Sequence, residues 1–100
     1  MGNITNEGGV KEEVKKILNK TPECWWYMPV QTGYGVHGIP DFVVCVRGIF
    51  LAIETKFGRN ELSPWQKRQE KSIGKAGGYY LVIVEHNIPT LEDFLRNIPQ

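Results

Sequence analysis

Hydrophobic residues recur at helical spacing near the start of the chain and form short unbroken runs further along it. Residues 9–20 carry an apolar residue every three or four positions between lysines and glutamates, which predicts an amphipathic helix. Thr21-Pro22 then ends this helix. The run CWWYM over residues 24–28 predicts a strand, and the glycine-rich segment 29–38 predicts a loop.

Two further apolar runs, residues 39–47 and 49–56, are separated by Arg47-Gly48, a pair suited to a two-residue turn. This pattern predicts a β-hairpin in which Val46 pairs with Ile49 and each further pair lies one residue out on either strand. Both faces of this hairpin are apolar. We therefore expect it to be buried in the middle of the sheet.

The second half of the chain predicts a helix, a strand and a last short helix. After a polar loop over residues 57–62, Ser63 is a favoured N-cap, with proline next and glutamine three residues on, as in a capping box. The helix should end near Ala76, where two glycines follow. The run YYLVIVE over residues 79–85 predicts a strand, and Thr90 begins the last helix.

The predicted order of elements is α-β-β-β-α-β-α, which indicates an α/β fold with a mixed sheet and helices on both faces. A chain of 100 residues is one domain, over residues 1–100. Its 41% hydrophobic and 23% charged residues are ordinary for a globular protein. The net charge of +1 argues against binding of nucleic acid by bulk charge, so such contacts would need local clusters of cations.

The cysteines and the N-terminus indicate the compartment. Cys24 and Cys45 lack the spacing of a zinc site and lie in apolar runs, where we expect small buried hydrophobic residues. The N-terminus is polar, unlike a signal peptide, and no apolar run is long enough to span a bilayer. We expect a reduced, intracellular, cytoplasmic domain without membrane contact.

The predicted hairpin brings three charged residues together. Asp41 lies opposite Glu54 with Cβ atoms about 4.5–5.5 Å apart, and Lys56 lies on the same face because strand side chains alternate. Opposed carboxylates destabilise a strand pair unless a cation compensates them. A divalent cation would do so, and would also polarise a phosphoryl oxygen and lower the pKa of bound water. Taken singly these residues are ordinary strand-end charges, but together they favour a metal site for phosphodiester hydrolysis.

The residues around these three resemble a nuclease signature. Pro40-Asp41, followed after a strand-length gap by Glu54-Thr55-Lys56, resembles the motif of PD-(D/E)XK nucleases. Residues 38–41 (GIPD) and 62–66 (LSPWQ), with Gly78 before the last strand, are similar to the stand-alone VRR-NUC domains of phages and bacteria, which belong to that superfamily.

This resemblance covers about residues 10–85 and implies an αβββαβ nuclease core that hydrolyses DNA with Mg²⁺ or Mn²⁺. It implies that Asp41, Glu54 and the backbone carbonyl of Thr55 bind the metal, and that Lys56 positions the attacking water. It also implies a homodimer that acts on branched DNA, with four-way (Holliday) junctions as the first expectation and flaps as the second.

The family also uses a glutamate on the first helix and a glutamine on the second. We select Glu13 as catalytic residue and further metal ligand because it lies on the edge of the apolar stripe; Glu12 and Glu7 remain alternatives, and a solvated helix charge is an equal reading of Glu13. Gln66 matches the glutamine and also completes the capping box. The two roles are compatible, since phosphate binds well at a helix N-terminus.

Cations recur at a spacing of four along the second predicted helix, a row that is often only a solvated face. Beside a metal site it predicts a surface that follows DNA phosphates. The candidate DNA contacts are Lys67, Lys71, Lys75, Arg59, Tyr34 and His37. Residues 33–38 fit the pattern GxGxxG, but a strand follows them instead of a helix, which excludes a dinucleotide fingerprint.

Two other functions stay open: a nicking or restriction-like nuclease of the same fold, and a catalytically idle module that binds DNA or forms subunits. The intact set of Asp41, Glu54 and Lys56 argues against the idle module. Aromatic residues in two predicted strands would either form a dimer interface or fill the core: Trp25, Trp26, Tyr27, Tyr79 and Tyr80.

Overall fold

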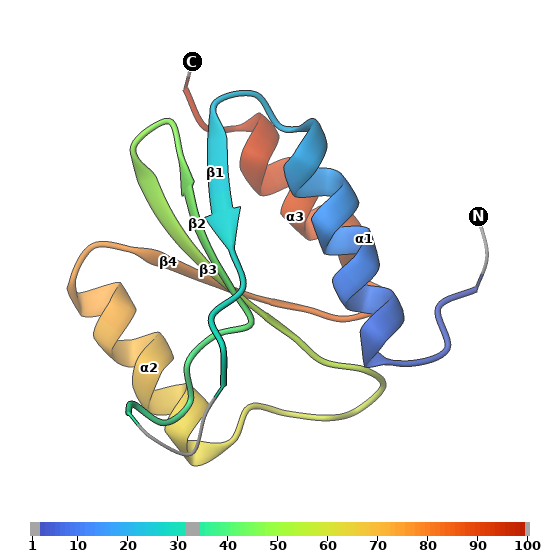
Figure 1. Ribbon diagram of the computed structural model, residues 1–100, viewed down its shortest axis with the longest axis vertical. Coiled ribbons are helices and arrows are strands. Elements are labelled where there is room, and N and C mark those ends of the chain that lie inside the picture. Colours follow the sequence, from blue (N-terminus) through green and yellow to red (C-terminus); the bar gives the residue numbers. More distant parts are fainter. Residues whose placement is uncertain (1–2, 32–34, 100) are drawn as a thin grey trace.

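The structure, a computed structural model, describes residues 3–31 and 35–99. A four-stranded sheet has the order β1-β2-β3-β4 (Figure 1). The strands are β1 (Cys24–Tyr27), β2 (Phe42–Val46), β3 (Ile49–Thr55) and β4 (Tyr79–Ile83). The helices are α1 (Glu7–Lys20), α2 (Pro64–Lys75) and α3 (Ile88–Arg96). Helices α1 and α3 pack together on one face of the sheet and α2 lies on the other (Figure 1), so the predicted α/β class is confirmed.

The β2–β3 hairpin has the predicted register. Val46 pairs with Ile49 and Phe42 with Ile53 in an antiparallel ladder. The turn residues Arg47 and Gly48 both have positive φ, 47° and 82°, as a two-residue turn of type I′ requires. Strand β4 then adds to β3 in the parallel direction, which makes the sheet mixed and places the hairpin at its centre.

The core lies between the sheet and the α1–α3 layer. Val10, Val14 and Leu18 recur at helical spacing on α1 and are buried, as the pattern of the sequence predicts. The helix begins two residues earlier than expected because Asn6 caps it, accepting the Gly9 N–H on its side chain at 2.9 Å. Trp26 turns toward this layer and packs on Phe42, with 5.7 Å between ring centroids.

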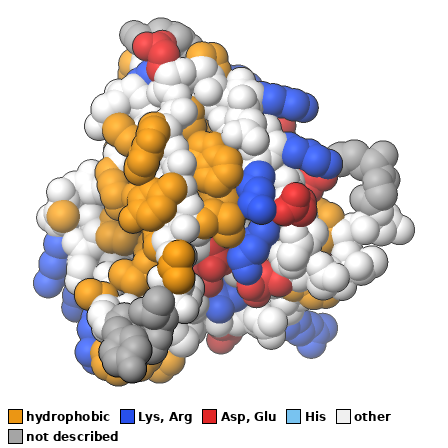
Figure 2. All heavy atoms as spheres, viewed as in Figure 1, with side chains coloured by type: hydrophobic (Ala, Val, Ile, Leu, Met, Phe, Trp, Pro, Cys, Tyr) orange, Lys and Arg blue, Asp and Glu red, His pale blue; other side chains and the backbone are white. Residues whose placement is uncertain are grey.

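The opposite face of the hairpin is less covered than the sequence suggests. Burial of both faces was expected, yet α2 has no buried residue and leaves part of the sheet exposed. Cys45 is exposed and Cys24 only half-buried, so the expectation of two buried cysteines is wrong. The open sheet face consists of Trp25, Tyr27, Cys45 and Phe50, and Figure 2 shows hydrophobic side chains gathered over the strands.

Several element ends also differ from the sequence pattern. Strand β2 begins at Phe42, three residues later than expected, and β4 ends at Ile83. Helix α3 begins at Ile88, where Pro89 occupies the first turn. Among the described residues, no helix combines the length and the apolar character needed to cross a bilayer.

Candidate active site

The open end of the β2–β3 hairpin joins Asp41 to β3. The Asp41 N–H donates to Oε1 of Glu54 at 3.2 Å, one position beyond the last strand pair. The Asp41 carboxylate accepts hydrogen bonds on Oδ2 from the Thr55 N–H at 3.0 Å and the Thr55 hydroxyl at 2.6 Å. Thr55 is fully buried. The Asp41 side chain is therefore held in one orientation by the strand that carries Glu54.

Glu54 is a carboxylate in a nearly closed environment, with only 3% of its surface exposed. Burial, together with the negative charge of Asp41, raises the pKa of Glu54 to about 7. The positive charge of Lys56 and the hydrogen bond from the Asp41 N–H act in the opposite direction but do not cancel the effect. A divalent cation bound at these two carboxylates would stabilise the ionised form of Glu54.

Gln66 links the N-terminus of α2 to Glu54. Its Oε1 accepts the Ser63 N–H at 2.8 Å, while the Ser63 hydroxyl accepts the Gln66 N–H at 3.2 Å, so the predicted capping box is present. The Nε2 of the same side chain donates to Oε2 of Glu54 at 2.9 Å. Capping and contact with the site are thus two functions of one amide.

Lys56 reaches the same carboxylate from the end of β3. Its Nζ lies 3.7 Å from Oε2 of Glu54, and its side chain is 14% exposed. The backbone N–H of Lys56 donates to the Ile83 carbonyl at 3.0 Å, which continues the pairing between β3 and β4 past the end of the strand. The structure therefore brings together Asp41, Glu54, Lys56 and Gln66, with Thr55 behind them.

Helix α1 presents Lys11 to this cluster, a residue that the sequence did not single out. Its Nζ lies 2.8 Å from Oε2 of Glu7 and 3.9 Å from Oδ2 of Asp41. Burial opposes the charged ammonium, but the hydrogen bond to Glu7 and the charges of Asp41, Glu7 and Glu54 outweigh it and raise the pKa of Lys11. The signal in the sequence was its position next to Val10, on the edge of the buried stripe.

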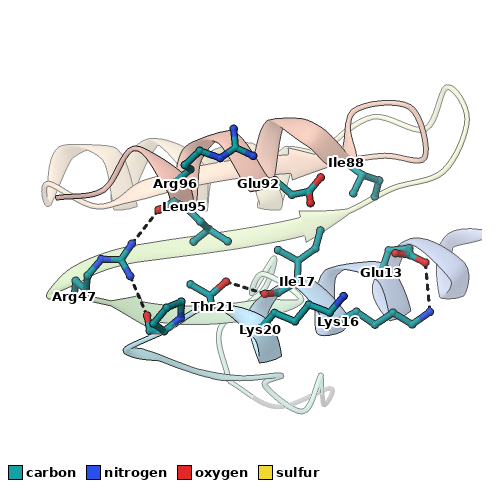
Figure 3. Close-up of a pocket in the computed structure, with 11 residues that line it drawn as sticks. Glu13, Lys16, Ile17, Lys20, Thr21, Arg47, Ile88, Glu92, Leu95 and Arg96 are labelled. Atoms are coloured by element: carbon teal, nitrogen blue, oxygen red, sulfur yellow. Dashed lines mark hydrogen bonds and ion pairs between the residues drawn. The ribbon is translucent and has the colours of Figure 1, made fainter. Parts of the chain in front are cut away.

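The structure does not bring Glu13 to this site. Glu13 lies 3.5 Å from Lys16 and lines a groove of about 590 Å³ between α1 and α3 (Figure 3). The reason is helical geometry: Glu13 follows Lys11 by two residues, so it lies about 200° around the helix, on the other edge of the buried stripe. Glu12 is exposed and pairs with Lys15. Glu7, one of the two alternatives, is the glutamate of α1 whose charge contributes to the raised pKa of Glu54.

Arg47 closes the end of that groove and has a structural role (Figure 3). Its guanidinium donates to the carbonyls of Pro22 and Leu95, both at 2.9 Å. These bonds join the hairpin turn to the start of β1 and to the C-terminal turn of α3. The groove that contains Glu13 therefore lies where α1, the hairpin turn and α3 meet. Its lining residues do not include Asp41, Glu54, Lys56 or Gln66.

The candidate DNA contacts lie around α2. Lys67, Lys71 and Lys75 are all exposed, as is Arg59, while Tyr34 lies outside the described residues. His37 is exposed and its ring lies 4.7 Å from that of Trp65.

Trp65 is a further candidate that the sequence analysis left as a motif position. Its side chain is 49% exposed, and the guanidinium of Arg68 lies 4.9 Å from its ring centroid. An exposed indole next to an imidazole and a guanidinium offers a stacking surface and positive charge one residue from Gln66.

The described residues contain no group of three or more His, Cys, Asp or Glu side chains that could hold a metal ion. The site offers two carboxylates, those of Asp41 and Glu54. This donor set suits Mg²⁺, which is commonly bound by one or two carboxylates and completes its shell with water and substrate phosphate.

Comparison with known proteins identifies the fold. No protein-family model matches the chain, and no curated protein matches it. A solved structure described as a VRR_NUC domain superposes with a TM-score of 0.72 and 22% sequence identity, covering 90% of this chain and 97% of the other. The similarity extends over almost the whole of both chains. The chain therefore has the fold of a VRR_NUC domain.

Proposed function

We propose that this chain is a metal-dependent endonuclease that hydrolyses phosphodiester bonds in DNA. The observation that carries the proposal is the pair of carboxylates of Asp41 and Glu54, which lie together at the open end of the central hairpin in a fold of the VRR_NUC type. A nearly buried glutamate whose pKa is raised to about 7 by burial and by Asp41 is costly to ionise in the absence of a cation. A bound divalent cation removes that cost.

Asp41, Glu54 and the Thr55 carbonyl would hold Mg²⁺ or Mn²⁺, which supplies Lewis-acid activation of the phosphodiester and of water. The residues of the chain orient the two carboxylates and supply a positive charge. Thr55 fixes the Asp41 carboxylate and Gln66 fixes that of Glu54, so neither has to reorganise. Lys56 holds a positive charge 3.7 Å from the Glu54 carboxylate, where it stabilises charge that develops on the phosphoryl oxygens.

The proposed DNA surface extends from this site along α2. Trp65 and His37 offer stacking surface at the helix N-terminus, and the exposed Lys67, Lys71 and Lys75 offer positive charge further along. Contacts of this kind follow phosphates and carry no base code, so recognition would depend on the shape of the DNA.

We propose four-way junctions as the substrate and a two-fold dimer as the active species. Resolution of a symmetric junction requires two incisions, which two identical sites supply. The open sheet face supports the dimer, because Trp25 is 61% exposed and Tyr27 47%, and large exposed aromatic side chains are typical of interface centres. Tyr79 is exposed on the opposite face of the sheet, and Trp26 and Tyr80 are half-buried. Of the five aromatic residues considered from the sequence, Trp25 and Tyr27 would therefore contribute to the interface, together with Phe50 of the same face.

A cleavage panel tests the function. Four-way junction, flap, duplex and single-stranded DNA are incubated with Mg²⁺, Mn²⁺ or EDTA and the wild type, Asp41→Asn, Glu54→Gln or Glu92→Gln. Glu92 is an exposed carboxylate of α3 and serves as the matched control. We expect metal-dependent cleavage of the junction by the wild type and by Glu92→Gln only. Full activity of both site variants would contradict the assignment, and preferential cutting of duplex DNA would favour a nicking or restriction-like enzyme.

A further inference from the structure

Lys11 lies in a position that the proposed chemistry does not use. Its ammonium group comes from α1, contacts Glu7 at 2.8 Å and lies 3.9 Å from Asp41 Oδ2, the oxygen that Thr55 also holds. Lys56, which directly follows β3, has its ammonium group 3.7 Å from Oε2 of the neighbouring carboxylate, Glu54. The two opposed carboxylates are therefore flanked by two ammonium groups from different elements.

The charges in this cluster explain how the metal-free protein tolerates it. Asp41, Glu54 and Glu7 contribute three negative charges when ionised, against two positive charges from Lys11 and Lys56. Lys11 is only 27% exposed, so water screens its attraction to the carboxylates less than it would on an open helix face. The negative charge of the cluster is therefore partly neutralised by the protein's own lysines, and Lys11 does so next to Asp41.

We propose that Lys11 is an internal cation that competes with the divalent metal for the Asp41–Glu54 site. With no metal bound, its ammonium group neutralises Asp41 and keeps the opposed carboxylates in place. When the metal binds, repulsion between the cations moves the ammonium group away from Asp41 while the hydrogen bond to Glu7 retains it. This inference rests on the proposed metal site and deepens it: Lys11 sets how tightly the metal is held before DNA arrives.

The same helix provides a matched control. Lys15 pairs with Glu12 at 2.9 Å, and that pair is more exposed, at 36% and 64% for the two side chains. Lys15→Met removes the same charge and the same kind of ion pair from the same helix, one turn away from the site. A role of Lys11 limited to support of the helix predicts equal effects of the two substitutions.

Mn²⁺ binding without DNA tests the proposal, with free Mn²⁺ followed by electron paramagnetic resonance and folding followed by circular dichroism. We expect Lys11→Met to bind Mn²⁺ about three- to tenfold more tightly than the wild type, while Lys15→Met and the charge-conserving Lys11→Arg stay within about twofold. In EDTA, Lys11→Met should melt below Lys15→Met, and saturating Mn²⁺ should close the gap. If Lys11→Met folds poorly without metal, the melting temperatures with and without Mn²⁺ still test the proposal.

Two results overturn the inference in different ways. Unchanged or weaker Mn²⁺ binding by Lys11→Met, in a protein that binds the ion normally as wild type, rejects competition and leaves the nuclease proposal intact. Absence of Mn²⁺ binding by the wild type itself rejects the metal site, and with it both proposals.

Discussion

The side-chain amide of Gln66 donates a 2.9 Å hydrogen bond from Nε2 to Oε2 of Glu54, while its Oε1 accepts the Ser63 N–H at 2.8 Å. A residue in the first turn of α2 thereby orients a carboxylate near the end of β3. Because the capping box fixes the amide, the bond to Glu54 is formed before any ligand arrives.

Separate substitutions should divide these two roles. Ser63→Ala removes one cap bond and should cost about 1 kcal/mol of stability with little effect on cleavage. Gln66→Ala removes a cap bond and a donor to a buried carboxylate, so we expect a loss of about 2–3 kcal/mol and a larger fall in cleavage rate. Urea unfolding and single-turnover cleavage measure the two quantities. Equal loss of activity in both variants would mean that Gln66 acts through the cap alone.

The pKa of Glu54 predicts how stability depends on pH without metal. Its pKa is raised from 4.5 to about 7 in the folded protein by burial and by Asp41, so folding favours the protonated form. Stability from this group is present below about pH 4.5 and is lost as pH rises toward 7, by up to about 3 kcal/mol.

Glu54→Gln removes that titration while keeping the shape of the side chain. In EDTA we expect the variant to be more stable than the wild type at pH 8 and similar to it near pH 4.5, as measured by urea unfolding. A wild-type stability with the same pH slope as Glu54→Gln would refute the raised pKa.

Gly38 positions the loop before Asp41 against α2. Its φ is +75°, and a Cβ there would lie 2.5 Å from the Trp65 carbonyl carbon and 2.8 Å from the Gln66 nitrogen. Gly35 has φ +96°, and no atom of the described residues would lie within 4 Å of a Cβ there, so we expect Gly35→Ala to carry mainly the backbone strain, about 1 kcal/mol. Gly38→Ala should cost about 1–3 kcal/mol more and reduce cleavage, since backbone must move. Equal melting temperatures of the two variants would show that the close approach is not required.

The lysines of α2 predict a change in salt dependence. Replacing Lys67, Lys71 and Lys75 with glutamine should weaken DNA binding and lower the slope of log K against log salt by about 0.9 for each lost phosphate contact on duplex arms. Fluorescence anisotropy with a labelled junction across a salt series gives the slope. A slope equal to that of the wild type would mean that these three lysines are solvated and make no phosphate contacts.

The open sheet face predicts the oligomeric state. Light scattering at micromolar concentration should give twice the monomer mass of 11.4 kDa. Trp25→Ser combined with Phe50→Ser should give the monomer, whereas Tyr79→Ser, on the opposite face, should not. A wild-type monomer that still makes paired, symmetric cuts in a junction would reject the dimer while leaving the nuclease proposal in place.

The sequence by itself determined the parts of this protein that depend on local periodicity and turn chemistry. Unbroken apolar runs on both sides of Arg47-Gly48 predict the hairpin and its register, because the two-residue turn leaves one pairing that places Asp41 opposite Glu54. Ser63, proline and Gln66 predict the start of α2 for the same kind of reason, since a capping box is completed within four residues.

Only the tertiary structure decided which edge of α1 reaches the carboxylates and how much of the sheet is covered. Helical spacing places Glu13 and Lys11 on the two edges of one buried stripe, but the rotation of the helix against β3 depends on residues far away in the chain. Coverage of the sheet depends likewise on α2, whose residues are polar enough to leave Cys45 and Phe50 exposed. The sequence of a strand shows which side chains are hydrophobic. Whether they are buried depends on whether a second layer of structure packs on them.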